Sequence, residues 1–156
     1  MQRAVAIVVA LAACQASDSR AVPAATPQQK LELIDAAPSG DVPAYLAALV
    51  AKSKVDGKKL VVYVGASWCE PCQRFHAAAA AGELDATLGD LRLVVFDADR
   101  DDPRLTAAGF HYAMIPLFAI PTADGHSTGR QIAGSVKGER AVAQIAPNLR
   151  RLVDQQ

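Results

Sequence analysis

Two cysteines separated by two residues, Cys69 and Cys72, stand between a β-prone run and an alanine-rich helical segment. The run Leu60 to Val64 is continuously apolar or aromatic, as expected for a strand buried on both faces of a sheet. Cysteines this close together cannot join distant parts of a fold, which excludes a small domain built on a disulfide framework. A cysteine at the amino terminus of a helix is instead stabilised as a thiolate by unpaired N–H groups and the helix dipole. The pattern therefore predicts redox chemistry at Cys69.

The length and charge of the chain limit its other possibilities. Its 156 residues suffice for one domain and short additional segments. The 16 Lys and Arg residues balance the 16 Asp and Glu residues, so no surplus positive charge is available to neutralise phosphates. We therefore expect no nucleic acid partner.

The third cysteine, Cys14, follows a segment with the pattern of a secretory signal peptide. Residues 1–13 contain Arg3, an apolar stretch and small residues, and they are too short to span a membrane. The sequence Leu11-Ala12-Ala13-Cys14 resembles the lipobox of bacterial lipoproteins, in which the cysteine thiol receives a diacylglyceryl group and cleavage occurs just before it. The resemblance implies lipidation of Cys14. The alternative is a cytosolic protein with a frayed apolar start and a chance cysteine.

A lipid on Cys14 would hold the protein to a membrane of the bacterial cell envelope, with the folded domain in the periplasm. Gln15 stands where an Asp would retain an enterobacterial lipoprotein at the inner membrane, so we expect the outer membrane. Residues 14–30 comprise the lipidated cysteine and a flexible tether rich in Ala, Pro, Ser and Gln. Residues 31–156 are predicted to form the folded domain.

Hydrophobic periodicity and turn signals predict alternating helices and strands in the folded domain. Helices are expected from Asp41 to Asp56-Gly57, from Cys72 to about Ala81, from Asp102-Pro103 to Gly109, and over about 139–153. Strands are expected at 60–64, 91–96, within 115–120, and at 130–133 after a turn at Asp124-Gly125. This order predicts an α/β fold with a mixed sheet and helices on both of its faces.

The segment Trp68-Cys69-Glu70-Pro71-Cys72 resembles the Trp-Cys-x-Pro-Cys active site of the thioredoxin superfamily. Met114-Ile115-Pro116 stands where that family carries a cis-proline facing the cysteines, and Asp124-Gly125 and Gly134 match its hairpin and its approach to the last helix. The resemblance covers about residues 41–153 and implies a thioredoxin fold. With the signal segment and the tether, the chain is most similar to membrane-tethered thioredoxin-like proteins of bacterial envelopes, several of which reduce disulfides.

The resemblance also implies a thiol-disulfide oxidoreductase that needs no cofactor. Cys69 would attack a disulfide of a protein substrate, and Cys72 would resolve the mixed disulfide. Trp68 would cover the site from one side, and a cis Pro116 would leave the backbone of Ile115 to pair with an extended substrate segment. The partners implied are proteins with disulfides or thiols and an unidentified redox donor or acceptor of the envelope.

Four positions depart from the pattern of the thioredoxins. Tyr63 replaces a buried Asp that assists proton transfer at the second cysteine, Ala77 replaces a kinking proline, and Leu117 replaces a common threonine. Pro147 interrupts the pattern of the last helix and is expected to kink it. The changes bear on turnover rather than on the fold.

Because Tyr63 replaces that Asp, Cys72 must lose its proton to water or to another group. Glu70 is one candidate for this group. The equal alternative is that Glu70 is only a solvated residue in the turn of the motif. The acidic Glu70 also disfavours the thiolate of Cys69, so we expect a reductant rather than a strong oxidant.

Two other functions remain open. Cys69, Cys72 and His76 offer three ligands for copper or zinc, which would make the chain a metal-binding or metal-delivery module. A structural zinc site usually has four ligands, so an ordinary surface or packed histidine is the expected role of His76. The third hypothesis is a redox-sensing interaction domain with little turnover. The acidic run 97–102 lacks the glycine and glutamate of a calcium loop and predicts a solvated loop.

Overall fold

The structure is a computed structural model that describes residues 29–155. The predicted signal peptide, the predicted lipidation site at Cys14 and most of the predicted tether lie outside the described residues. Within residues 29–155, no helix has the length and apolar character needed to cross a bilayer.

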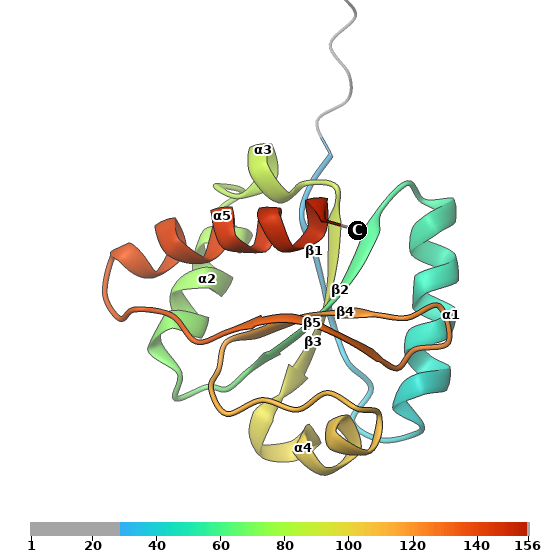
Figure 1. Cartoon of the computed structure of the whole chain (residues 1–156). Coiled ribbons are helices and arrows are strands. Elements are labelled where there is room, and N and C mark those ends of the chain that lie inside the picture. Colours follow the sequence, from blue (N-terminus) through green and yellow to red (C-terminus); the bar gives the residue numbers. More distant parts are fainter. Residues whose placement is uncertain (1–28, 156) are drawn as a thin grey trace, which may run out of the picture.

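The described part of the chain contains one mixed sheet of five strands in the order β1-β3-β2-β4-β5 (Figure 1). The strands are β1 (Glu32–Asp35), β2 (Lys59–Gly65), β3 (Leu91–Asp97), β4 (Leu117–Pro121) and β5 (Ser127–Ala133). β1, β3 and β2 are parallel, whereas β4 is antiparallel to β2 and β5 is antiparallel to β4. Parallel neighbours place the carboxyl ends of β1, β2 and β3 at the same edge of the sheet.

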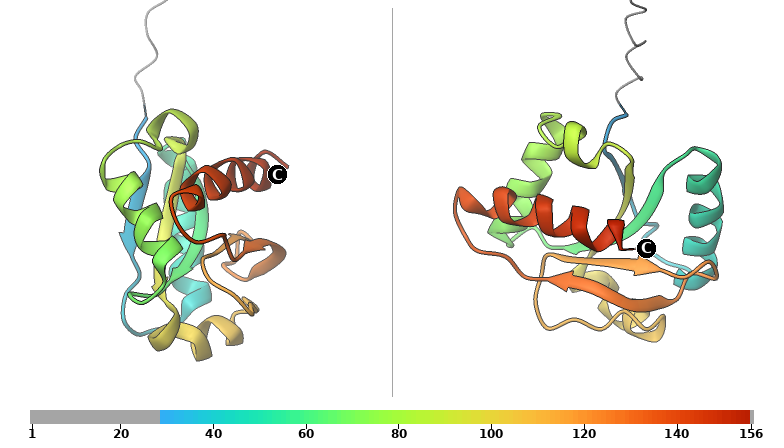
Figure 2. Two further views of the ribbon diagram at one scale, coloured as in Figure 1. Left: turned by 90° about the vertical axis from the view of Figure 1, so that its left-hand side faces the viewer. Right: turned by 45° about the horizontal axis from the view of Figure 1, so that its top comes forward.

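Helices cover both faces of this sheet. They are α1 (Val42–Val55), α2 (Glu70–Ala80), α3 (Asp85–Leu88), α4 (Ala98–Ala107) and α5 (Arg140–Asp154). Buried side chains of α2, α3 and α5 share one hydrophobic cluster, and those of α1 and α4 share another. In the left view of Figure 2, α2 and α5 lie in front of the sheet and α1 lies behind it.

β2 shows why a continuous apolar run is needed at the centre of the fold. Val61 and Tyr63 pack with α2, α3 and α5, whereas Leu60, Val62 and Val64 pack on the side of α1 and α4. Successive side chains of a strand point to opposite faces, so a strand covered on both faces must be apolar throughout. The strand order, the strand directions and the two covered faces confirm the predicted α/β class and thioredoxin fold.

The predicted ends of α1 and the predicted hairpin are confirmed. The Asp41 carboxylate accepts a hydrogen bond from the N–H of Ala44 at 2.7 Å, which caps the first turn of α1. The helix ends at Asp56, followed by Gly57 with a φ of 69°. The turn between β4 and β5 contains Gly125 with a φ of 86°, a backbone conformation that L side chains rarely adopt.

Three elements differ from the sequence prediction. β1 and α3 were not predicted, because four-residue elements are too short to show a period. α4 begins at Ala98 rather than after Asp102, so Pro103 lies inside the helix. Pro147 also lies inside a helix that continues past it, with its ring on the exposed side of α5.

The prediction of a solvated loop over the acidic run 97–102 is wrong. Asp97 is the N-cap of α4 and accepts hydrogen bonds from the N–H groups of Asp99 and Arg100. Asp101 is fully buried and accepts hydrogen bonds from the guanidinium groups of Arg100 and Arg104 and from the N–H of Asp97. These carboxylates therefore begin a helix and form ion pairs.

Candidate functional site

The two cysteines lie just beyond the carboxyl end of β2, where the chain turns into α2. Cys69 is the N-cap residue of α2, and its sulfur accepts a hydrogen bond from the N–H of Cys72 at 3.3 Å. Pro71 lies in the first turn of α2. N–H groups of the first turn have no acceptor within the helix, so the N–H that proline lacks is not missed there. A disulfide joins Cys69 to Cys72, with their Cα atoms 5.2 Å apart.

Trp68 projects from the surface next to this disulfide. Its side chain is 66% exposed, whereas Cys69 and Cys72 are only 5% and 2% exposed. The indole N–H of Trp68 donates a hydrogen bond to the carboxylate of Asp99 at 2.8 Å. The first turn of α4 therefore holds the indole beside the disulfide.

The sheet register brings Pro116 to the same end of the molecule. Leu117 pairs with Val64 in the β2–β4 ladder, so Pro116 lies next to the last residue of β2. The Ile115–Pro116 peptide bond is cis, as the resemblance implied. The carbonyl of Pro116 accepts a hydrogen bond from the N–H of Gly134 at 2.9 Å, which links β4 to the end of β5.

An apolar groove of about 390 Å³ opens beside Trp68. Met114, which is 61% exposed, and Ile115 form its wall on the β4 side. Gly134 also lines the groove next to Met114, and a Cβ atom there would stand 3.3 Å from the sulfur of Met114. Exposed apolar side chains around a groove of this kind suit contact with the side chains of another protein.

The Glu70 side chain reaches the loop before α5. Its carboxylate accepts hydrogen bonds from the Arg74 side chain and from the N–H of Gly138, the latter at 3.1 Å. These donors, Arg74 first, hold the pKa of Glu70 below its ordinary value. The carboxylate therefore stays ionised and links the active-site turn to residue 138.

Tyr63, in β2, is completely buried. Its ring stacks on Phe118 at 4.7 Å and meets Phe75 edge-on at 5.6 Å. A Cβ atom added at Gly65 would lie 3.1 Å from the Tyr63 hydroxyl and 3.4 Å from the Cβ of Cys72, so this hydroxyl is close to Cys72. The hydroxyl has no hydrogen-bond partner within residues 29–155. Burial raises the pKa of Tyr63 well above its ordinary value.

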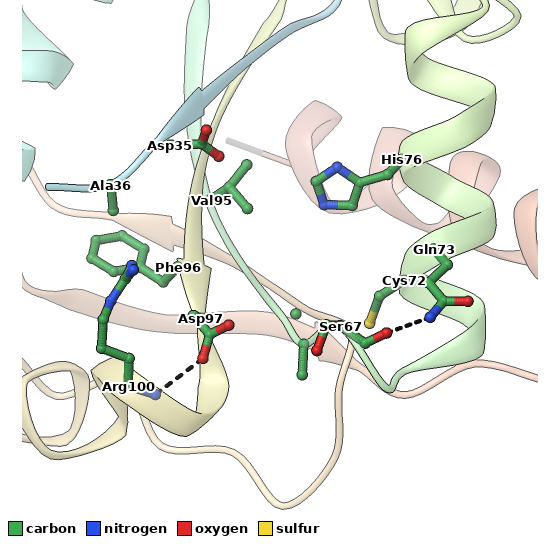
Figure 3. Close-up of a pocket in the computed structure, with 12 residues that line it drawn as sticks. Asp35, Ala36, Ser67, Cys72, Gln73, His76, Val95, Phe96, Asp97 and Arg100 are labelled. Carbon is green, nitrogen blue, oxygen red and sulfur yellow. Dashed lines mark hydrogen bonds between the residues drawn. The ribbon is translucent and has the colours of Figure 1, made fainter. Parts of the chain in front are cut away.

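A second pocket, of about 470 Å³, opens on another side of Cys72 (Figure 3). Cys72 and His76 project into it from α2, and Asp35 and Val95 face them from β1 and β3. His76 is half-buried, with its ring 5.2 Å from the ring of Tyr63. Burial lowers the pKa of His76, and the negative charge of Asp35 opposes part of this effect.

The described residues offer no ready metal centre. Across residues 29–155, no three His, Cys, Asp or Glu side chains are grouped so that they could hold a metal ion. His111 and His126, the other two histidines, are exposed in loops and do not line the pocket of Cys72 and His76. The hypothesis of a ligand set formed by Cys69, Cys72 and His76 therefore gains no support from the geometry.

Sequence reasoning missed three partners of the site: Asp35, Asp99 and Gly138. Asp35 lies on a strand that was not predicted, 41 positions before His76, and no sequence signal connects the two. Asp99 was noted only as part of an acidic run. Gly138 follows Gly134 in the loop before α5, and nothing local indicates that its N–H meets the carboxylate of Glu70.

Sequence comparison matches about half of the chain to parts of two plant proteins. No protein-family model matches the chain. The chain is 33% identical over 82 residues to a protein described as probable nucleoredoxin 1 of Arabidopsis thaliana, and 33% identical over 75 residues to probable nucleoredoxin 3 of Oryza sativa subsp. japonica. These matches cover 49% and 46% of this chain but only 14% and 15% of the two relatives. The matched part of the chain thus spans only about one seventh of the length of these relatives.

Among solved structures, the chain is similar to several thioredoxins. A Schistosoma mansoni thioredoxin pre-protein matches with 24% identity and a TM-score of 0.48, over 78% of this chain and 98% of that one. Poplar thioredoxin h matches with 19% identity and a TM-score of 0.45, over 81% of this chain and 95% of that one. Trichomonas vaginalis thioredoxin matches with 19% identity and a TM-score of 0.46, over 81% and 97%.

Proposed function

We propose that the chain is a thiol-disulfide oxidoreductase that reduces disulfides of other proteins through Cys69 and Cys72. The observation that carries the proposal is a disulfide at the amino terminus of α2, next to an apolar groove with exposed side chains. The similarity to two nucleoredoxins over about half of the chain supports a redox role.

Cys69 is the proposed nucleophile. It occupies the N-cap of an 11-residue helix, where its sulfur faces the N–H of Cys72 and the positive end of the helix dipole. Both features stabilise a thiolate. Cys72 lies within the first turn and is less exposed, which suits the group that resolves the mixed disulfide.

The groove beside Trp68 is the proposed docking place for the substrate. An extended segment there would lie along Ile115 and Pro116, with its apolar side chains against Met114 and the indole of Trp68. Backbone pairing at a strand end gives affinity with little dependence on sequence, so we expect a range of protein substrates.

The proposed direction is reduction of the substrate. Residue 70, which follows Cys69 in the chain, is an ionised glutamate rather than a cationic residue, and Arg74 is paired with it, so no side chain of the motif adds positive charge to stabilise the Cys69 thiolate. Strong oxidants of this chemistry owe their potential to a highly stabilised thiolate. Equilibration with glutathione should therefore give a potential closer to about −270 mV than to about −120 mV. A value near the second figure would reverse the direction.

Insulin reduction by dithiothreitol tests the activity. The wild type should accelerate the reaction, and Cys69→Ser should abolish the acceleration. Cys72→Ser should accumulate covalent adducts with substrate proteins that dithiothreitol releases, because no internal thiol remains to resolve them. Trp68 is the only tryptophan, so its fluorescence should change on reduction of the wild type and stay constant in both variants. Tight binding of copper or zinc by the reduced protein, without turnover, would favour the metal-binding alternative.

We also propose that the protein is a lipoprotein of the bacterial cell envelope, anchored through Cys14 with its domain in the periplasm. The folded domain suits such an anchor, because β1 begins at the opposite end of the parallel strands from the cysteines. Figure 1 shows β1 starting at the top of the molecule and α2 starting near the bottom. An anchor before β1 would therefore leave the disulfide facing away from the membrane.

Metabolic labelling with a fatty acid in a bacterial host tests the anchor. The wild type should be labelled and found with membranes, and Cys14→Ser should lose both properties. Sucrose-gradient separation of inner and outer membranes then tests the expected outer-membrane position. A wild-type protein that is unlabelled and recovered in the soluble fraction contradicts the proposal.

A further inference from the structure

The pocket next to Cys72 has no part in the proposed docking of substrate. It shares no lining residue with the groove beside Trp68, and it reaches from Cys72 past His76 to Asp35 on the edge strand β1. Its volume of about 470 Å³ has room for several water molecules, each of which occupies about 30 Å³. The pocket therefore connects a buried sulfur with solvent and with titratable groups.

If the proposed function holds, Cys72 must lose a proton in each cycle. Only a thiolate attacks a disulfide, and burial in apolar surroundings disfavours the thiolate of a residue that is 2% exposed. Thioredoxin-like chemistry at this position thus requires a proton acceptor within reach of Cys72.

Two of the nearby groups are unsuited to accept this proton. The phenol of Tyr63 is neutral, and burial raises its pKa far from neutrality, so it can donate a hydrogen bond but not take up a proton. Glu70 is engaged with Arg74 and the N–H of Gly138, and its lowered pKa makes it a weak base.

The charged groups on the far wall of the pocket have other partners or lie further out. Asp97 caps α4 through the N–H groups of Asp99 and Arg100, and the guanidinium of Arg100 is paired with Asp101. Asp35 is exposed at the mouth of the pocket.

His76 has the required position. It lies one helical turn after Cys72 on the same face of α2, and side chains four residues apart on a helix are neighbours. Figure 3 shows both side chains directed into the pocket from α2, with Asp35 opposite. We propose that His76 accepts the proton of the Cys72 thiol through water in this pocket.

The step is balanced as follows. The proton passes from the sulfur of Cys72 through water to the imidazole of His76. The Cys72 thiolate then attacks the sulfur of Cys69, the Cys69–substrate disulfide breaks, and the Cys69–Cys72 disulfide forms. The substrate leaves as a thiolate and takes its proton from the imidazolium or from solvent. The two cysteines are oxidised by two electrons, which the substrate disulfide gains.

The electrostatic surroundings of His76 suit this role. Partial burial lowers its pKa, so the imidazole is neutral at pH 7 and free to accept a proton. The carboxylate of Asp35 faces the imidazolium that forms and stabilises it.

Stopped-flow reaction of the reduced protein with the chromogenic disulfide dithionitrobenzoate separates the two cysteines. Attack by Cys69 releases the first thionitrobenzoate at a rate that depends on reagent concentration. Attack by Cys72 on the resulting mixed disulfide releases the second thionitrobenzoate at a rate that is independent of reagent concentration. Glutamine in His76→Gln keeps a polar side chain but accepts no proton at neutral pH, so the second release should slow about 100-fold at pH 7. The first release should change less than about twofold.

The pH profile distinguishes proton transfer from a structural role. In the wild type, the second release should fall as the pH drops through the pKa of His76, whereas in His76→Gln it should follow hydroxide, about tenfold per pH unit. Asp35→Asn removes the charge that raises the pKa of His76, so the fall should move to lower pH. His111→Gln, an exposed histidine outside both pockets, is the control and should leave both releases unchanged.

An unchanged rate and pH profile of the second release in folded His76→Gln overturns the inference. If His76→Gln does not fold, Asp35→Asn tests the inference in its place. A pH profile of the second release that does not move in Asp35→Asn then overturns the inference. If the wild type reduces insulin but the second release is unaltered in His76→Gln, the role of His76 is rejected and the proposed function stands. The opposite result is that both releases behave as expected but the wild type neither reduces insulin nor forms substrate adducts. That result would reject the proposed function and keep His76 as the proton acceptor of the dithiol.

Discussion

Replacing Tyr63 by Phe should stabilise the protein, although the position is at the centre of the core. The Tyr63 hydroxyl is completely buried and has no hydrogen-bond partner among residues 29–155. The ring itself is well packed, stacked on Phe118 and edge-on to Phe75. Phenylalanine keeps those ring contacts and removes only the oxygen.

The expected gain follows from the loss of an unpaired polar group. A buried hydroxyl without a partner destabilises the folded state by about 1 to 3 kcal/mol. Removing the oxygen leaves a void of about 15 Å³, which costs about 0.4 kcal/mol at about 24 cal/mol per Å³. The free energy of unfolding should therefore rise by about 1 to 2 kcal/mol, and the midpoint of thermal unfolding by about 3 to 6 °C.

Urea unfolding with the Cys69–Cys72 disulfide intact measures this change. Tyr45→Phe is the matched control, because the Tyr45 side chain is only partly buried on α1 and should change stability by less than about 0.5 kcal/mol. A loss of about 1 kcal/mol or more in Tyr63→Phe would refute the reasoning. It would mean that the hydroxyl forms a hydrogen bond in solution, for example with water in the pocket beside Cys72.

Three further predictions concern other parts of the fold. Asp101→Ala should lower the free energy of unfolding by about 2 kcal/mol in urea titrations, because Arg100, Arg104 and the N–H of Asp97 lose their hydrogen bonds to this carboxylate. Burial alone would raise the pKa of Asp101, but hydrogen bonds from Arg100, from the backbone and from Arg104 hold it below the ordinary value. The contribution of this carboxylate should thus be complete above about pH 5 and be lost as the pH falls through the lowered pKa, a dependence that the variant should lack. Gly65→Ala should destabilise the protein by about 1 to 3 kcal/mol in thermal melts, because its Cβ would press on the Tyr63 hydroxyl. Leu149→Ala, in the buried face of α5, should cost about 2 to 5 kcal/mol in the same assay, and a smaller loss would mean that α5 packs loosely.

The sequence alone determined the elements whose signals are local. The apolar run of β2, the Asp41 cap of α1 and the glycine of the β4–β5 turn each depend on neighbouring residues, and the structure has all three. The spacing of Cys69 and Cys72 after a strand and before a helix likewise placed the disulfide at a helix amino terminus. Local propensity and periodicity suffice to predict such features, because the signals lie within a few neighbouring residues even where the element, as in β2, goes on to pair with distant strands.

Only the tertiary structure decided where α4 begins and which strand forms the edge of the sheet. The sequence favoured Asp102-Pro103 as a helix start, yet Asp97 caps the helix because β3 ends there and because Asp101 finds its partners inside the fold. β1 is too short to show a period, and its strand conformation depends on the parallel ladder with β3, about 60 residues further along the chain.

The surroundings of the cysteines were also decided only by the tertiary structure. Pairing of Val64 with Leu117 brings Pro116 to the end of β2, and the β1–β3 ladder carries Asp35 across the pocket from His76. Glu70 was a candidate base from its place in the motif, but its carboxylate meets Gly138, 68 positions away. Side chains of a motif are fixed by local sequence, whereas the partners that set their protonation come from strands and loops that only the folded sheet brings together.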